Sequence, residues 1–378
     1  MNAPPIHEAP EQEYRVTPLE LFFDLVFVFG VSQLSHHLLS QLSWRGAAET
    51  LVMLLAIFAV WFATSWSATI FPVDQPRMRR LILAVMLLGL FMNASVTRAF
   101  TTSPWAFILP FLLIQLGRAI WMIVNAEQAR GRDHYLRMLL WLIATTPLWI
   151  AGALVAPEAR LLWWALAAGG DTIGRWLAHP IPGRRLHSEN VPFDAVHMLE
   201  RCRLFLLIAL GETVFTTGTA IAEASRTLMT LVTGTFALVG TIALWGLSFG
   251  RSHRLILQHL QETSNPIRTS RYAVNVLMVM VAGLIALAVA NEMVIVHPQE
   301  PASLALSLLL AGGPILFLAA QGWYFMAILN VRSKLHWIGG VGLLLVLLAT
   351  FVMPAYLALI LVGTSLTSLA ILDQKTTD

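Results

Sequence analysis

Long runs of apolar residues, separated by short polar stretches, recur along the chain from Leu19 to Leu372. Each run has about 20 residues, the length of helix that crosses a hydrocarbon core roughly 30 Å thick. The pattern therefore predicts twelve membrane-spanning helices. In the first half they cover residues 19–41, 49–71, 80–100, 105–125, 136–156 and 159–179, and in the second half residues 197–223, 228–249, 270–294, 302–328, 335–354 and 355–372.

Composition agrees with this pattern and defines the fold class. Apolar residues make up 57% of the chain and charged residues 12%, whereas soluble domains carry about 25% charged residues. We therefore expect an all-α membrane protein whose main partner is the lipid bilayer. The basic residues are scattered and form no nucleic-acid motif, so we expect no nucleic-acid partner. The single cysteine, Cys202, excludes an intramolecular disulfide.

The spans group into two halves, residues 19–179 and 197–372. We expect a cytoplasmic N-terminal segment (residues 1–18), a cytoplasmic linker (180–196) and a cytoplasmic tail (373–378). The first fourteen residues are acidic and contain proline, unlike a signal peptide, so the first span is expected to remain as a membrane helix.

The distribution of basic residues predicts the orientation. Loops after odd-numbered spans contain only four arginines, Arg45, Arg98, Arg160 and Arg226. Loops after even-numbered spans are richer, and the positive-inside rule places them and both termini in the cytoplasm. Their basic residues are Arg77, Arg79, Arg80, Arg130, Arg132, Arg137, Arg184, Arg185, Arg251, Arg254, Arg268, Arg271, Arg332 and Lys334.

The two halves resemble each other in sequence. Leu19-Glu20 aligns with Leu199-Glu200, and Trp66 then falls beside Trp245. Six spans per half is an even number, so both halves would enter the membrane in the same direction, as parallel repeats do in some transporters. The alternative is chance, because glycine, proline and tryptophan are common in membrane helices.

Two short segments place ionisable residues at the start of a span. Glu20 and Asp24 lie four residues apart and therefore share a helix face. His197, Glu200 and Arg201 occupy one turn at the start of the seventh span. Acids within membrane segments are costly and are retained mainly where they are paired or used. We interpret these five residues as a cytoplasmic gate, with Glu20 and Asp24 also candidates for proton or cation binding.

Other interpretations of these segments stay open. Acids in a first helical turn are stabilised by the helix dipole, which fits Glu20 better than the deeper Asp24. His197, Glu200, Glu20 and Asp24 could also ligate a metal, but the commoner arrangement is an ion-paired cluster in which Arg201 and Arg203 neutralise the acids. We therefore expect no metal and no cofactor, and the sequence identifies no catalytic residue.

Glu212 lies twelve residues beyond Glu200 on the same predicted helix, near the middle of the bilayer, and no arginine neighbours it in sequence. A carboxyl group in such a place is suited to carrying a proton, so Glu212 is a further candidate for ion or proton coupling. The alternative is a protonated side chain that hydrogen-bonds a neighbouring helix. Asp171 and Arg175, four residues apart, are expected to form an ion pair within their helix.

The segment Arg15-Val-Thr-Pro-Leu-Glu-Leu-Phe-Phe-Asp-Leu-Val-Phe-Val resembles the opening signature of the bacterial low temperature requirement A family. His197-x-x-Glu-Arg, followed by Leu-Phe-x-x-Ile-x-Leu-Gly-Glu212, resembles its second signature. Cys202-Arg203 departs from the Phe-Gly common in the family and adds a positive charge beside Glu200. The resemblance implies a location in the bacterial cell (inner) membrane. The family name reflects a growth phenotype and implies no biochemical activity.

Three function hypotheses follow. The first is a secondary transporter of a small solute, based on the repeat, the embedded carboxylates and the absence of a soluble domain. The second is an intramembrane enzyme with a carboxylate–histidine site, and the third is a scaffold or sensor whose polar residues hold the helices together. The sequence contains no nucleotide-binding loop, Gly-x-Ser-x-Gly or His-Glu-x-x-His motif, which weakens the enzyme hypothesis.

Overall fold

The computed structural model describes residues 16–126, 129–181, 193–249, 265–331 and 334–375, together with residues 259 and 263. These residues form thirteen helices and no sheet. The helices are α1 (Pro18–Ser40), α2 (Trp44–Ile70), α3 (Pro76–Ala94), α4 (Val96–Ala99), α5 (Pro104–Asn125), α6 (Ala129–Leu154), α7 (Pro157–Trp176), α8 (Ala195–Glu223), α9 (Leu228–Phe249), α11 (Pro266–Val296), α12 (Leu304–Ile328), α13 (Lys334–Thr350) and α14 (Ala355–Lys375).

The predicted class, a helical protein that crosses the membrane several times, is confirmed. Within the described residues, nine helices are long and apolar enough to span a bilayer: α1, α2, α5, α6, α8, α9, α11, α12 and α14. The other three predicted spans are also helical, but α13 has only 17 residues, and α3 and α7 each carry three or more charged residues. The count of twelve spans therefore stays a prediction.

Several helices begin at residues that satisfy the free N–H groups of a first turn. Thr17 forms a capping box with Glu20 at α1, and Asp194 accepts a hydrogen bond from the backbone of His197 at α8. Asn265 caps α11 in the same way. Proline occupies the first turn of α1, α3, α5, α7 and α11, where its missing N–H has no cost.

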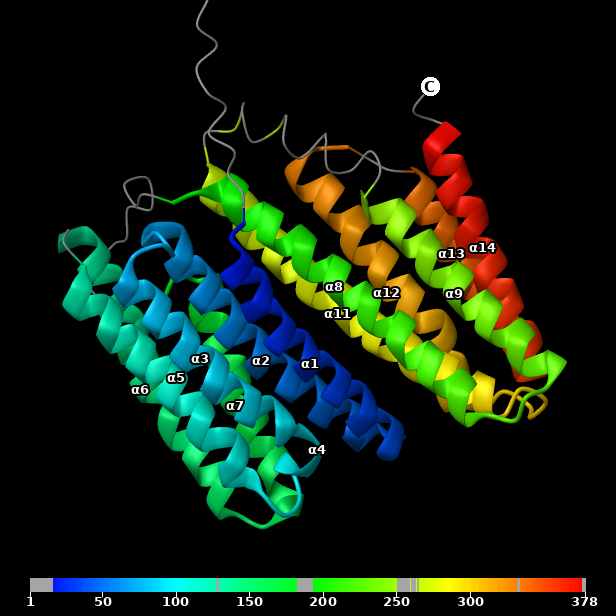
Figure 1. The fold of residues 1–378 in the computed structure, drawn as a ribbon, viewed down its shortest axis with the longest axis horizontal. Coiled ribbons are helices and arrows are strands. Elements are labelled where there is room, and N and C mark those ends of the chain that lie inside the picture. Colours follow the sequence, from blue (N-terminus) through cyan, green and yellow to red (C-terminus); the bar gives the residue numbers. More distant parts are fainter. Residues whose placement is uncertain are drawn as a thin grey trace, which may run out of the picture.

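The helices form two groups, α1–α7 and α8–α14, which lie side by side (Figure 1). The same neighbours recur in each group. In the first, α1 packs on α2 and α3, α5 on α3 and α6, and α7 on α6 and α2; in the second, α8 packs on α9 and α11, α12 on α11 and α13, and α14 on α13 and α9. The groups meet where α1 and α2 contact α8 and α11.

One end of this bundle carries most of the described arginines and is called here the arginine-rich end. Helices α1, α6, α8 and α11 begin there, and α2 and α7 end there. Contacts join these helix ends: Trp66 of α2 stacks on Phe193 just before α8, and Arg271 of α11 donates to the carbonyl of Trp176 at the end of α7.

Aromatic and small side chains hold the bundle together. Between the two groups, Phe205 of α8 packs on Phe58 and Trp61 of α2, with ring centroids 5.4 and 4.7 Å apart. Between α11 and α12, Gly283 and Gly313 let two backbones touch, because a Cβ at either position would lie within 2.6 Å of the other carbonyl oxygen. Small residues at a helix crossing allow this approach in membranes.

Parts of the predicted domain division lie outside the described residues. These are most of the N-terminal segment (1–15), most of the linker (182–192) and the last three residues of the tail (376–378).

Candidate functional site

The first half of the candidate site is Glu20, which the start of α1 fixes in place. Its Oε2 accepts hydrogen bonds from the backbone N–H and the hydroxyl of Thr17, at 2.9 and 3.0 Å. This capping box holds the carboxylate at the arginine-rich end of the bundle and leaves Oε1 to face α8. Asp24 follows one turn deeper on the same face.

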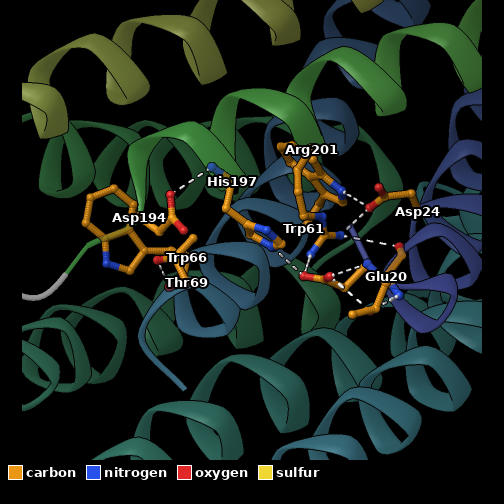
Figure 2. A network of polar contacts seen from close by, with 9 residues as sticks. Glu20, Asp24, Trp61, Trp66, Thr69, Asp194, His197 and Arg201 are labelled. Carbon is orange, nitrogen blue, oxygen red and sulfur yellow. Dashed lines mark hydrogen bonds and ion pairs between the residues drawn. The ribbon is translucent and has the colours of Figure 1, made fainter. Parts of the chain in front are cut away.

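The second half of the site comes from α8. His197 Nε2 lies 2.8 Å from Glu20 Oε1, and one turn further Arg201 reaches both acids. Its Nη1 donates to Glu20 Oε1 at 3.3 Å and its Nη2 to Asp24 Oδ1 at 2.5 Å. Figure 2 shows the guanidinium between the two carboxylates, with the imidazole directed at Glu20. The structure thus brings together four of the five predicted gate residues, from the two halves of the chain.

Trp61 of α2 completes the cluster, and sequence reasoning did not identify it. Its Nε1 donates to Asp24 Oδ1 at 2.7 Å, and its side chain is fully buried. The chain has thirteen tryptophans, and tryptophan is common in membrane helices, so the residue type alone does not mark Trp61. The position of Trp61 near the centre of a long apolar run was the available signal that it lies deeper.

The cluster is buried and unbalanced in charge. Glu20 and Asp24 are 0% exposed and Arg201 is 1% exposed. With both acids ionised, two negative charges face one guanidinium, so the group is neutral only when it also holds one proton, on His197 or on a carboxyl group. Uncompensated charge is expensive in a low-dielectric interior. Asp24 Oδ2 and Arg201 Nε have no hydrogen-bond partner, which leaves room for a rearranged pairing.

The fifth predicted gate residue, Glu200, lies outside the cluster. Its carboxylate pairs with Arg203 at 3.3 Å on a partly exposed face of α8. Arg203, the residue that departs from the family pattern, therefore neutralises Glu200, and Arg201 remains with Glu20 and Asp24. The gate role of Glu200 stays a prediction.

Glu212 lies further along α8 and is not part of the cluster. Its side chain is half-buried, and its Oε1 is a buried atom without a hydrogen-bond partner. The neighbouring Gly211 borders open space, with nothing within 4 Å of a Cβ built there. An unpaired carboxyl oxygen within a membrane-spanning helix fits the predicted proton carrier, but its role stays a prediction.

The four candidate metal ligands are not gathered into a metal site. Glu200 pairs with Arg203, and the guanidinium of Arg201 contacts both Glu20 and Asp24. Among the residues that the structure describes, no group of three or more His, Cys, Asp or Glu side chains could hold a metal ion.

The predicted ion pair between Asp171 and Arg175 is wrong. Asp171 instead accepts hydrogen bonds from Thr145 Oγ1 at 2.6 Å and Trp149 Nε1 at 3.0 Å, both on α6. Arg175 donates to Thr172 at 3.0 Å. The acid therefore joins α7 to α6 because two donors of the neighbouring helix lie nearer than the arginine does.

The apolar helices and the buried charge cluster between α1 and α8 define a polytopic helical membrane protein with a polar site between its halves. The sequence matches the family described as bacterial low temperature requirement A protein (LtrA) over residues 15–371, and the chain belongs to this family. The resemblance found in the two motifs is thus confirmed, and the cluster contains residues of both motifs.

The chain is also similar to a curated protein. The chain is 30% identical over 311 residues to an uncharacterized protein, RA0937, of Rhizobium meliloti (strain 1021). The match covers 80% of this chain and 75% of the relative.

Proposed function

We propose that this protein is a secondary transporter in which Glu20, Asp24, His197 and Arg201 form a proton-dependent gate between two halves. The observation that carries the proposal is the burial of Glu20, Asp24 and Arg201 at the contact between α1 and α8, with the half-buried His197 bound to Glu20. A cluster that is neutral only with one additional proton responds to a change in protonation by changing its pairing. Rearranged pairing at this contact would alter how the halves meet.

Glu212 is proposed as the second proton-carrying group. It follows Arg201 on α8 by eleven residues, about 16 Å at 1.5 Å per residue. A proton released near the cluster would be exchanged with Glu212 as the halves rock, which is how alternating access operates in parallel-repeat transporters. The unpartnered Oε1 of Glu212 supports this role, because no neighbouring donor fixes its charged form.

The repeat and the orientation belong to the same proposal. The recurrence of the same helix neighbours in α1–α7 and α8–α14 supports two parallel repeats of six spans. The arginine-rich end would face the cytoplasm of a bacterial cell by the positive-inside rule, and the gate would then open toward the cytoplasm.

The test is proton movement in proteoliposomes that contain the purified protein and an internal pH dye. An imposed pH gradient is applied with a panel of solutes that includes phosphate compounds, carboxylates, amino acids and sugars, and both current and internal pH are recorded. Wild-type protein is expected to move protons with one solute class. Glu212→Gln is expected to abolish this movement, and His197→Gln to slow it.

Glu223→Gln is the matched control, because this exposed glutamate ends the same helix. It is expected to behave as wild type. Equal proton movement in wild type and Glu212→Gln would refute the carrier role. Absence of proton movement with every solute would contradict transport and favour a scaffold, in which the paired cluster only joins the halves.

A further inference from the structure

A second polar site lies at the arginine-rich end, apart from the Glu20–Arg201 cluster. A cavity of about 550 Å³ opens between α2, α5, α6, α7 and the start of α11. Its walls combine aromatic and aliphatic side chains, such as Phe62, Trp66 and Met138, with charged groups. Both the size and this mixture are typical of a small-molecule binding site.

The charged groups of this cavity all have the same sign. Five arginines line it, and none of the lining residues that the structure describes is acidic. His134 and His179 add two imidazoles, with ring centroids 6.4 Å apart. Of the five arginines, Arg137 has a carboxylate partner, Asp133, at 2.8 Å. The five are Arg118, Arg137, Arg175, Arg268 and Arg271.

Arg118 is the most informative of these residues. It is 1% exposed, yet its guanidinium contacts only neutral acceptors. These are the carbonyl of Ala63 at 3.2 Å, the hydroxyl of Ser67 at 3.4 Å, the amide oxygen of Gln115 at 3.0 Å and the sulfur of Met138 at 3.9 Å. Its Nε has no partner. A buried cation without an anion is strongly destabilising, so the site is incomplete without a negative charge.

Arg160 shows how this fold stabilises another buried arginine, which also lies near the carboxylates of Glu49 and Glu158. Arg160 is 4% exposed, and it donates to four backbone carbonyls, those of Gly152, Ala99, Thr101 and Val155. These carbonyls lie at or near helix ends, where the dipole is negative. Arg118 lies within a helix and receives no such compensation.

Unpartnered donors concentrate around the same cavity. Besides Arg118 Nε, the buried Nε1 of Trp66 and Nε of Arg271 have no acceptor. Burial and the nearby His134, Arg175 and Arg118 lower the pKa of His179, outside the membrane helices, to about 3. Burial is the larger cause and the nearby cationic groups are the smaller one, so this imidazole lies neutral beside the arginines of the cavity.

The backbone at the cavity is strained as well. Ala178 and His179, which line it after the end of α7, have φ values of 56° and 53°. The left-handed region costs a residue with a side chain about 1–2 kcal/mol. These residues close the end of α7, where the N–H of His179 donates to the carbonyl of Gly174 at 2.7 Å and left-handed residues are common, and the turn forms one wall of the cavity.

We propose that this cavity binds the phosphate group of an anion, either the headgroup of an anionic phospholipid or a small phosphate compound. Arginines bind phosphate oxygens through paired N–H groups, and a phosphate dianion matches several cations better than a single carboxylate does. The aromatic and aliphatic wall formed by Phe62, Trp66 and Met138 would contact the glycerol or other organic part of the ligand. This site does not depend on the transport function proposed above.

The experiment measures binding to purified wild-type protein with two kinds of probe. For the lipid source, native mass spectrometry follows the retention of phosphatidylglycerol against phosphatidylcholine, added in equal amounts. For the soluble source, calorimetry follows the binding of inorganic phosphate and glycerol 3-phosphate, with succinate as the carboxylate probe. Neither measurement requires transport, so failure of one proposal is separate from failure of the other.

Arg118→Gln and Arg268→Gln are expected to weaken binding of the active probe about tenfold or more, the effect of losing one charge-assisted hydrogen bond. Arg268 is exposed, so its variant maintains the test if Arg118→Gln fails to fold. Arg203→Gln is the control, since Arg203 pairs with Glu200 outside this cavity, and it is expected to stay within about twofold of wild type.

Each result either assigns the ligand of this cavity or contradicts the proposal. Selective loss of phosphatidylglycerol in the two variants assigns a lipid headgroup, and selective loss of phosphate or glycerol 3-phosphate assigns a soluble ligand. Binding of succinate alone would overturn the phosphate assignment. Binding of no probe by wild type, or equal binding by wild type and both variants, would overturn the site.

Discussion

Single residues determine the character of the site between the two halves. Arg201 contacts the carboxylates of Glu20 and Asp24, which lie four residues apart on α1. His197 and Trp61 supply the other donors. Removing the single guanidinium from such a buried group leaves two carboxylates uncompensated, which costs more than the pairing itself contributes. The free-energy cost of this arrangement can therefore be measured by replacing single residues.

Replacing Arg201 by glutamine is expected to destabilise the protein by about 3–5 kcal/mol, because the buried Glu20 and Asp24 lose the guanidinium that both contact. Reversible unfolding in mixed detergent micelles measures this free energy. Glu200→Gln serves as the matched control, since Glu200 and Arg203 form a partly exposed pair and such pairs contribute at most about 1 kcal/mol. Equal losses of unfolding free energy in the two variants would show that the contacts of Arg201 with the buried acids contribute no more than the partly exposed pair does.

Whether a residue of this site could be predicted from the sequence depended on how unusual its residue type is at that position in the chain. Glu20, Asp24, His197 and Arg201 were identified because acids and bases at the start of apolar runs are rare and conspicuous. Trp61 was missed because tryptophan is common in membrane helices. Arg118 was missed although it lies inside the predicted span 105–125, where a lone arginine is itself a signal of function.

At the scale of elements, the helices were predictable and their contacts were not. Apolar length predicted the spans, since a helix is the way for a single segment to satisfy its backbone in lipid. Which faces meet depends on side chains far apart in sequence, as the wrong pairing of Asp171 shows. Thr145 and Trp149 lie 26 and 22 residues from Asp171, and nothing local indicates that they approach it.

The crossing of α11 and α12 allows a matched test of element packing. Gly313→Ala is expected to destabilise the protein by a few kcal/mol, because the new Cβ would lie 2.6 Å from the carbonyl oxygen of Gly283 and overpacking costs about 1–3 kcal/mol. Gly312→Ala, one residue earlier, has nothing within 4 Å of its Cβ and is expected to be neutral or slightly stabilising. Thermal unfolding of both variants compares them, and the reverse order would contradict the close backbone contact.

At the scale of the whole molecule, the two sites lie at the same end of the bundle and belong to different parts of it. The Glu20–Arg201 cluster joins the two halves, whereas the cavity around Arg118 lies mainly within the first half and is reached by the start of α11. Because α11 also contacts α1, α2 and α8, an anion bound in the cavity would bear on the same contact between halves as the cluster does. Helix α11 therefore lines the cavity and also contacts the helices that carry the cluster.

Both sites acquire their biological meaning from the side of the membrane that the arginine-rich end faces. The native Cys202 is buried and is expected to react poorly, so single cysteines can be introduced against a quiet background. Asp74→Cys lies in the exposed connection between α2 and α3 at the arginine-rich end, and Thr102→Cys is exposed before α5 at the opposite end.

In spheroplasts, a membrane-impermeant maleimide is expected to label Thr102→Cys at once and Asp74→Cys only after permeabilisation. The unmodified protein is the control for Cys202. The opposite pattern would invert the orientation and place the cluster and the cavity on the outer face, where neither a cytoplasmic gate nor a site for a cytosolic phosphate compound could operate.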